Sequence, residues 1–251
     1  MSRRVIQRQF VLTVCAMLAA VGCNLFAPPD GTIPDTVPDF DAATFSDPST
    51  IDNPFFPQPV GVTRTYEGGG EVIIIDVLDD QKEVMGIAVR VVRDRVFVDG
   101  VLVEDTHDWF AQDDEGNVWY MGEEVDNYNY DGNGQLIDIT HEGAWEAGKD
   151  VAGLGVVALP GHVMKASPAV GDRYSQEYYP GEAEDMGEVV ALNVPVTLGD
   201  GTQFVTLQTR DFTPLEPDAN EYKYYAEGIG VVREEVVGGD ERIDLVSVEQ
   251  P

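Results

Sequence analysis

The sequence predicts an all-β protein: an antiparallel meander forming a strongly curved sheet, either a half-open or a flattened barrel, with little helix. From Arg64 onward apolar and polar residues alternate, and turns rich in Gly and Asp interrupt the alternation at short intervals. A period of two residues places one side of each segment against a core, as in half-buried strands. No stretch keeps the 3.6-residue helical period over a helical length; residues 183–192 are doubtful, but their apolar residues fit a strand as well.

The expected strands follow each other as hairpins. The first two are residues 71–78 and 87–98, and Asp99-Gly100 is a tight turn into residues 101–104, because both turn residues tolerate positive φ. Three further hairpins pair residues 108–112 with 118–121, 128–130 with 136–140, and 194–198 with 203–209. The last strands are residues 221–226, 230–235 and 242–248. Consecutive hairpins make antiparallel neighbours, and a sheet with this many strands must curl to protect its edges.

Residues 1–22 are predicted to be a lipoprotein signal peptide. A basic start is followed by an apolar run over residues 10–21. The run matches a signal sequence and is shorter than the roughly 20 residues that a membrane-spanning helix needs. Its end, Ala20-Val21-Gly22-Cys23, resembles the lipobox of bacterial lipoproteins, whose cysteine receives palmitate-type acyl chains and becomes the mature N-terminus. The alternative is an ordinary signal peptide, cleaved at a nearby small residue.

The resemblance to a lipobox implies a chain held in the cell envelope by the lipid on Cys23. Asn24 after the cysteine favours the outer membrane, if the organism has one. Residues 23–58 are predicted to be a Pro-rich tether, since prolines at this density prevent helix and sheet. Phe55-Phe56 are expected to dock on the edge of a single antiparallel β domain over residues 59–251.

Composition limits the partners of this domain. The formal net charge of −31 disfavours nucleic acid, although it suits either cations and basic partners or simply a solvated acidic shell. Hydrophobic residues make up 43% of the chain, enough for a folded core. The two cysteines lie in the signal (Cys15) and at the lipid site (Cys23), so the mature domain has neither disulfide nor thiol chemistry.

Several short segments of the chain form a distinctive set: NPFFP (53–57), VVRDRV (91–96), LVEDT (102–106), DWFAQD (108–113), GNVWY (116–120), GAWEAG (143–148), QEYY (176–179) and GEAED (181–185). Together they resemble an uncharacterised family of secreted bacterial proteins and lipoproteins. This resemblance implies no activity and no catalytic residues. Residues 224–232 bear a weaker similarity to the final hairpin of lipoprotein-carrier-like curled sheets.

A polar group around the second hairpin is the first candidate binding site. Strand alternation puts Asp105, His107 and Trp109 on one face and Glu104, Thr106, Asp108 and Phe110 on the other. The first face, with Gln112 and with Trp119 across the hairpin, is suited to a polar ligand. The alternative is an exposed sheet face with one buried tryptophan.

An acidic group late in the chain is the second candidate. It consists of Glu177, Glu182, Glu184 and Asp185. Carboxylates this close together suit a hard cation or the acid and base of a glycosidase, but they also suit a solvated surface. Basic residues are scarce, so Arg90, Arg93 and Arg95 are expected to pair with these acids inside the curled sheet.

Residues 127–138 partly follow the pattern of a calcium loop. Asn127, Asn129 and Asp131 alternate before Gly132, and Asp138 occupies the twelfth position. Asp replaces the usual Glu at that position and no helices flank the loop, so a hairpin turn explains the same residues. Calcium is therefore the one weak metal expectation, and no other cofactor is expected.

These observations favour a lipid-anchored envelope protein that binds a ligand or partner and is not an enzyme. The ligand is a small molecule, a glycan or a protein, and no catalytic residue is assigned. Two alternatives stay open: an envelope glycan hydrolase using paired carboxylates, and a calcium-dependent adhesion or structural module.

Overall fold

The computed structural model describes residues 33–217 and 219–251, so the predicted signal and Cys23 lie outside the described residues. One 3-10 turn, η1 (Phe40–Ala42), precedes the strands. The strands are β1 (Thr63–Gly68), β2 (Glu71–Val84), β3 (Ile87–Val98), β4 (Val101–Gln112), β5 (Val118–Tyr130), β6 (Leu136–Thr140), β7 (Trp145–Glu146), β8 (Leu159–Met164), β9 (Arg173–Ser175), β10 (Glu177–Tyr178), β11 (Met186–Thr197), β12 (Gln203–Phe212), β13 (Asn220–Ala226), β14 (Gly230–Val236) and β15 (Arg242–Glu249). Over the described residues, no helix has the length and apolar character needed to cross a bilayer.

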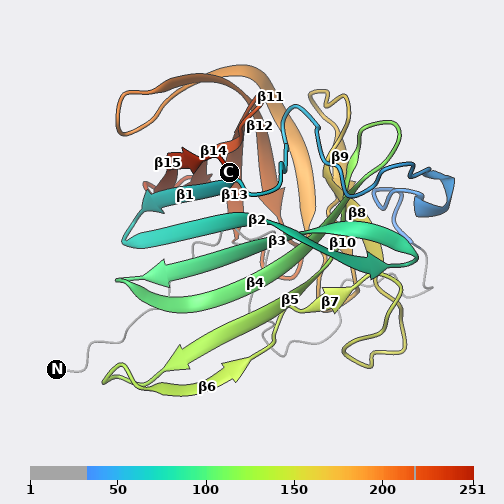
Figure 1. The fold of residues 1–251 in the computed structure, drawn as a ribbon, viewed down its shortest axis with the longest axis horizontal. Coiled ribbons are helices and arrows are strands. Elements are labelled where there is room, and N and C mark those ends of the chain that lie inside the picture. The colour runs from blue at the N-terminus through green and yellow to red at the C-terminus, as the bar shows by residue number, and fades with distance from the viewer. Residues whose placement is uncertain (1–32, 218) are drawn as a thin grey trace.

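All of these strands belong to one antiparallel sheet, which confirms the predicted fold class. The order across the sheet is β10-β8-β5-β4-β3-β2-β1-β15-β14-β13-β12-β11-β9, and β6 and β7 also pair with β5. Figure 1 shows β2 to β5 fanned across one side and β11 to β14 curling over from the other. The sheet is therefore strongly curved and nearly closed into a barrel.

The two edges of the sheet are forced together by chain connectivity. Strand β9 lies at one edge and β10 at the other, yet only Gln176 separates them in sequence. Consecutive Cα atoms are about 3.8 Å apart, so the edges cannot separate by more than a few residues' length. Gly161 on β8 marks the contact: a Cβ there would lie 2.2 Å from the carbonyl oxygen of Ser175.

Most of the predicted strands are present, and several are longer than expected. The Asp99-Gly100 turn has positive φ at both residues, 50° and 79°, as its sequence predicts. The segments 101–104 and 108–112 are parts of one strand, β4, because bulges absorb the irregularity in its pairing with β3 and β5. The doubtful segment 183–192 contributes to strand β11 and not to a helix.

Aromatic side chains fill one end of the curved sheet. Tyr120 stacks on Phe110 with ring centroids 5.0 Å apart and meets Trp145 edge-on at 5.3 Å. Trp119 and Tyr66 are also almost fully buried. Each such ring removes about 150–250 Å² of surface from water, so this group is a major source of stability.

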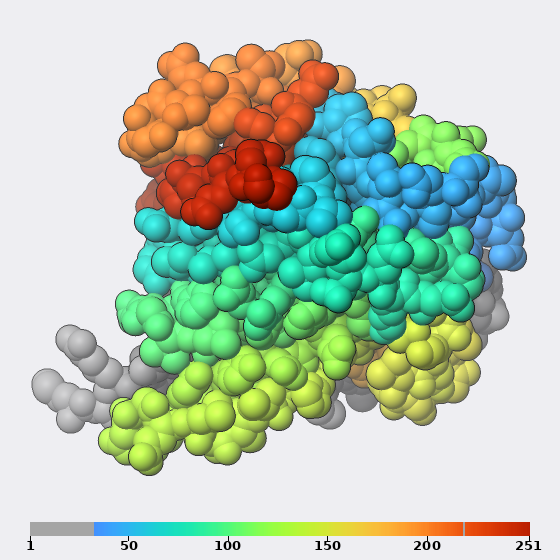
Figure 2. Space-filling model, viewed as in Figure 1, coloured from blue at the N-terminus to red at the C-terminus, as the bar shows by residue number. Residues whose placement is uncertain are grey.

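The N-terminal segment packs on the sheet. Phe40 meets the ring of Trp119 at 5.2 Å, and Ile51 is buried in the core. Asn53 donates through Nδ2 to the carbonyl oxygens of Gly116 and Lys165. Figure 2 shows this segment lying against the body of the protein. The described part of the expected tether, residues 33–58, is therefore part of the domain, because its apolar side chains are buried there.

Phe56 docks as expected, with its ring 5.1 Å from that of Phe110. Phe55 is only partly buried. The proline content of this segment still excludes regular structure, but extended backbone is compatible with dense packing.

We expect Gly161→Ala to lower the free energy of unfolding by about 1–3 kcal/mol, because the added methyl group overpacks the contact between the sheet edges. Urea denaturation measures this. Gly132→Ala is the matched control: a Cβ there meets nothing within 4 Å. Equal effects of the two substitutions would show that the edges are not in tight contact.

Candidate functional site

The inner face of the curved sheet carries a set of buried charged side chains, here called the inner acid cluster. Its members come from both sides of the sheet and are Asp94, Glu104, Asp108, Glu123, Glu177, Asp211, Lys223 and Glu234. None is more than 5% exposed. Burying a charge is costly unless it is paired or neutralised, so this interior departs from an ordinary apolar core.

Lys223 on β13 is the cation of the cluster. Its Nζ lies 3.3 Å from Oδ2 of Asp211 and 3.6 Å from Oε1 of Glu234. Burial alone would lower the pKa of Lys223, but the neighbouring carboxyls outweigh it and hold the pKa well above its usual value. Asp211 is fixed in turn by Gln176, which donates to Oδ2 at 3.1 Å, and by Thr209, which donates to Oδ1 at 2.8 Å.

Asp94 and Asp108 lie on the opposite wall, on β3 and β4. Burial raises the pKa of Asp94 well above its usual value, and repulsion from Asp108, Glu104 and Glu234 raises it further. Burial likewise raises the pKa of Asp108 to about 7, although Tyr120 donates a 2.7 Å hydrogen bond to its Oδ1. Glu234 belongs to β14, so the curvature brings residues of distant strands within electrostatic range.

Three glutamates of the cluster, Glu123, Glu177 and Glu234, are poorly hydrogen-bonded. Among the described residues, their carboxylate oxygens make no hydrogen bond of good geometry. The polar side chains beside them are Tyr120, Trp145 and Lys223, respectively. Burial is the main cause of the raised pKa of each of these groups. Glu123 lies directly opposite Asp108 in the β4–β5 pairing, so two acids share one position of the sheet. Buried carboxyls of this kind stay protonated unless a nearby cation stabilises their charged form.

A narrow cavity of about 50 Å³ lies between the two walls. Its polar lining comes from Gln58, Arg64, Tyr66, Asp94, Asp108, Lys223 and Glu234. The guanidinium of Arg64 is already committed, since it donates to Gln58 and to the carbonyl oxygens of Pro57 and Ile229. A water needs about 10–15 Å³ by this measure, so the cavity has room for a few waters or for one small polar group.

Of the acids predicted from the sequence, Asp108 and Glu177 belong to this interior, and Asp108 contributes to the raised pKa of Glu177. Asp185 is buried beside Glu177 and raises its pKa more strongly. Glu184 instead accepts a 2.7 Å hydrogen bond from the backbone N–H of Gly181 and closes a turn. Glu182 is only half-buried.

The three arginines do not pair with the acids at 177–185, so that expectation is wrong. Arg93 makes a two-point contact with Asp105 at 2.8 and 2.5 Å, and Arg95 contacts Asp76 at 2.5 Å. Arg90 donates to backbone carbonyl oxygens. Side chains alternate along β3, so Arg93 and Arg95 point outward while Asp94 between them points inward.

The second-hairpin residues divide as strand alternation predicts, but the structure does not bring them together as one wall. Trp109 lies on the outer side beneath Lys82, whose Nζ is 3.0 Å from the ring centroid. Trp119 donates to Asp113 at 2.8 Å. Gln112 accepts hydrogen bonds from the backbone N–H groups of Asp52 and Asn53. These contacts hold the N-terminal segment and the hairpin in place.

The candidate calcium residues form a hairpin turn. The carboxylate of Asp131 accepts hydrogen bonds from the N–H groups of Asn133 and Gln135. Asn127 donates to the carbonyl oxygen of Glu142, and Asn129 faces Asp138 across the hairpin. Within residues 33–217 and 219–251 no three acidic, His or Cys side chains are arranged to hold a metal ion.

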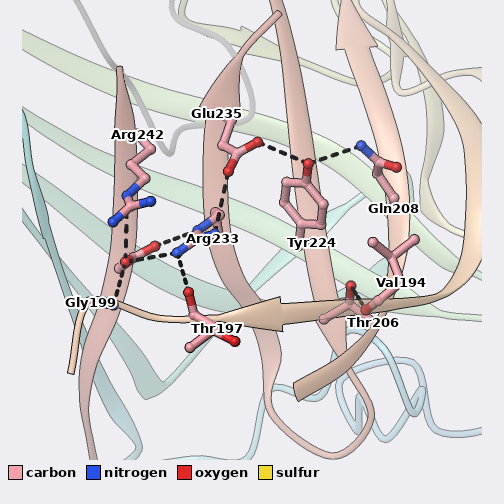
Figure 3. Close-up of polar contacts among 10 residues, drawn as sticks. Val194, Thr197, Gly199, Thr206, Gln208, Tyr224, Arg233, Glu235 and Arg242 are labelled. Carbon is pink, nitrogen blue, oxygen red and sulfur yellow. Dashed lines mark hydrogen bonds and ion pairs between the residues drawn. The ribbon is translucent and has the colours of Figure 1, made fainter. Parts of the chain in front are cut away.

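The outer face of β13 to β15 has a different kind of charge network, shown in Figure 3. Arg233 donates to Asp244 at 2.6 and 3.0 Å and to the carbonyl oxygen of Thr197 at 2.8 Å. Tyr224 links Glu235 and Gln208. These groups are partnered, and the network fastens the β11–β12 hairpin over the sheet. Unpartnered carboxylate oxygens are characteristic of the inner face.

Sequence reasoning missed Asp94, Glu123, Lys223 and Glu234 as site residues. Lys223 follows Tyr222 and precedes Tyr224-Tyr225, and Asp94 stands within a strand rich in valine. A charged residue at an inward position of an apolar strand was the available signal. Choosing the inward side required the sheet's curvature, which the sequence pattern does not give.

No protein-family model matches the chain, and no curated protein is similar to it. One solved structure, a "putative lipoprotein" from Parabacteroides distasonis, aligns over 78% of this chain and 98% of its own, with 12% identity and a TM-score of 0.38. A TM-score this low does not establish a shared fold or function. The resemblance to a secreted family therefore stays a prediction.

Protonation of the interior predicts stability that falls as pH rises. A carboxyl whose pKa is raised by folding favours the folded state at low pH, and this is lost between its unfolded pKa, about 4, and its folded pKa. For Asp108 the loss extends to about pH 7. Buried His162, with its pKa lowered to about 4, acts in the opposite direction below pH 6.5.

We expect Asp108→Asn to reduce the loss of unfolding free energy between pH 5 and pH 7.5, measured by urea denaturation, because asparagine does not titrate. Between pH 5 and the folded pKa of about 7, the two pH units correspond to about 3 kcal/mol. Comparison with the parent chain cancels the His162 contribution. Val92→Ala, opposite Asp108 on β3, is the control and should destabilise equally at each pH. An unchanged pH dependence in Asp108→Asn would contradict a neutral interior Asp108.

Proposed function

We propose that this protein is a lipid-anchored component of the cell envelope whose curved sheet binds a small ligand in its interior. The anchor is supported by the signal-like N-terminus and by Cys23 at its end. The binding function is supported by the inner acid cluster and by the cavity between the two walls. No enzymatic activity is part of the proposal.

The observation that carries the binding function is an excess of buried carboxyls over buried cations. Lys223 contacts Asp211 and Glu234, but Asp94, Asp108 and Glu123 have no lysine or arginine within ion-pairing distance among the described residues. Buried polar groups without partners reduce stability, so their presence here favours a ligand that completes them.

The chemistry of the lining favours a ligand with a cationic, hydrogen-bond-donating group, such as a primary amine. An ammonium group offers three donors and replaces protons that the carboxyls otherwise retain. Tyr66, Phe110 and Tyr225 at the cavity add aromatic faces and edges, against which a cation and its alkyl chain are stabilised. The small volume restricts the part inside the sheet to the amine end of a ligand.

A glycan hydrolase and a calcium-dependent module stay as sequence predictions. The acids that converge, Asp108 and Glu177, are buried, whereas Glu182 and Glu184 lie at a turn. Asp131 already accepts hydrogen bonds from its own hairpin. Neither observation favours these functions over ligand binding.

Thermal denaturation of the mature chain, from Cys23 onward, with alkyl diamines, neutral sugars and alkyl carboxylates tests the ligand class. We expect a rise in Tm with a diamine that increases from pH 6 to pH 8, because ionised carboxyls bind a cation more strongly. Glu234→Gln should remove most of this rise, whereas Glu182→Gln should retain it. A rise with sugars alone, or none with amines, would overturn the amine assignment.

Metabolic labelling with a palmitate analogue in bacterial cells tests the anchor. We expect the full chain to incorporate the label and to fractionate with membranes, and Cys23→Ser to lose both properties, since its hydroxyl is not an acceptor for this modification. Cys15→Ser should behave like the parent chain. Release of unlabelled parent protein into the medium would support an ordinary signal peptide instead.

A further inference from the structure

The loop between β7 and β8 exposes four large apolar side chains. Val151, Leu154, Val156 and Val157 are 54%, 47%, 41% and 51% exposed. Met85, at the β2–β3 turn, is 45% exposed and lies beside Gly148 at the start of this loop. We call these five side chains the apolar rim. Contiguous exposed apolar residues of this kind mark contact with a partner or a membrane.

The loop has a defined shape. Both carboxylate oxygens of Asp150 are used, since Oδ1 accepts from the N–H of Leu154 and Oδ2 from the N–H of Gly155, each at 2.8 Å. The hydroxyl of Tyr179 donates to Asp150 at 2.6 Å and accepts from the N–H of Ala152. These bonds hold the apolar side chains outward, so their exposure requires no local unfolding.

The loop lies at the end of the protein where the chain enters the sheet. Tyr179 fixes the loop, and Ser175, four residues earlier, donates through its N–H to the carbonyl oxygen of Thr36. In Figures 1 and 2 the N-terminal segment and the loop, blue and yellow, occupy the same end of the molecule. Cys23 precedes Thr36 by 13 residues, a span of at most about 45 Å. A lipid on Cys23 therefore keeps Thr36, and the end of the molecule that it occupies, within about 45 Å of the membrane.

Local charge fits the same orientation. The chain as a whole is strongly acidic, yet Lys82 and Lys149 both stand beside the loop, where they neutralise Glu146 at 2.9 and 2.6 Å. The acid nearest the apolar residues, Asp150, is enclosed by hydrogen bonds. Paired acids reduce the repulsion that an anionic surface would otherwise exert at this end.

We propose that the apolar rim inserts into the interfacial region of the bilayer that holds the acylated Cys23, so that the domain has a fixed orientation on the membrane. The proposal rests on the anchor proposed above. Valine, leucine and methionine side chains enter the boundary between headgroups and acyl chains by about 5–10 Å, and each contributes a modest free energy. One lipid anchor with a second weak contact gives stable attachment.

Tryptophan fluorescence on vesicles tests this insertion. The mature chain is coupled through Cys23 to maleimide-bearing lipid in phosphatidylcholine vesicles, with or without brominated acyl chains. Leu154→Trp reports on the rim, and Ile137→Trp, on the 65% exposed side chain of β6 at the other end of the molecule, is the matched control. The native tryptophans, Trp109, Trp119 and Trp145, are buried and contribute a constant background.

We expect the emission of Leu154→Trp, after subtraction of the native background, to move to shorter wavelength on vesicles and to lose intensity with brominated lipid, and that of Ile137→Trp to change little. Val156→Trp provides a second reporter if Leu154→Trp lowers the Tm. An unquenched rim on attached protein would overturn the proposal, as would quenching at Ile137→Trp instead. A vesicle-independent shift that grows with protein concentration would show self-association and would also overturn it.

Chemical coupling separates this result from the anchor. If cells leave Cys23 unacylated but the coupled Leu154→Trp is quenched, the proposed anchor fails while the affinity of the rim for lipid stands. If acylation occurs and the rim stays unquenched, the anchor stands and the orientation fails.

Discussion

The structure depends on one connection, the single residue Gln176 that joins the two edges of the sheet. Because β9 and β10 follow each other in sequence but lie at opposite ends of the strand order, the sheet must curl until its edges meet. Gln176 also connects this closure to the interior, since its side chain donates to Asp211 and its backbone N–H to the carbonyl oxygen of Asp185. The residue that joins the two edges of the sheet therefore also contacts an enclosed carboxyl.

The enclosed interior is a compromise between stability and chemistry. Apolar replacements at Glu123 or Glu234 would fill the same space without a desolvation cost, and buried ionic groups are often less stable than such replacements. Lys223 lies within ion-pairing distance of Asp211 and Glu234 but not of the carboxyls on the opposite wall. By contrast, the outer network around Arg233 is fully hydrogen-bonded. Sites that violate local rules in this way are expected where a protein binds something.

In the proposed attachment to the membrane, the N-terminal segment connects the interior of the sheet to the lipid anchor. It covers the aromatic end of the core through Phe40 and Phe56, and it enters the sheet beside the loop that carries the apolar rim. In the proposed orientation, this segment and the apolar rim lie at the end of the curved sheet that faces the lipid surface. Ligand binding and membrane orientation are then linked by geometry, because both depend on how this segment packs.

The sequence by itself determined the class of fold and most strand positions, because alternation and turn residues such as Asp99-Gly100 act over a few neighbours. It also identified Asp108 and Glu177 as unusual acids. It did not determine which face of each strand turns inward, so Arg93 and Arg95 were expected in the interior and Lys223 was overlooked. Only the tertiary structure decides which face is enclosed, because closure of the sheet at Gln176 brings its two edges together. The electrostatic coupling between Asp94 on β3 and Glu234 on β14 likewise exists only in the curled sheet.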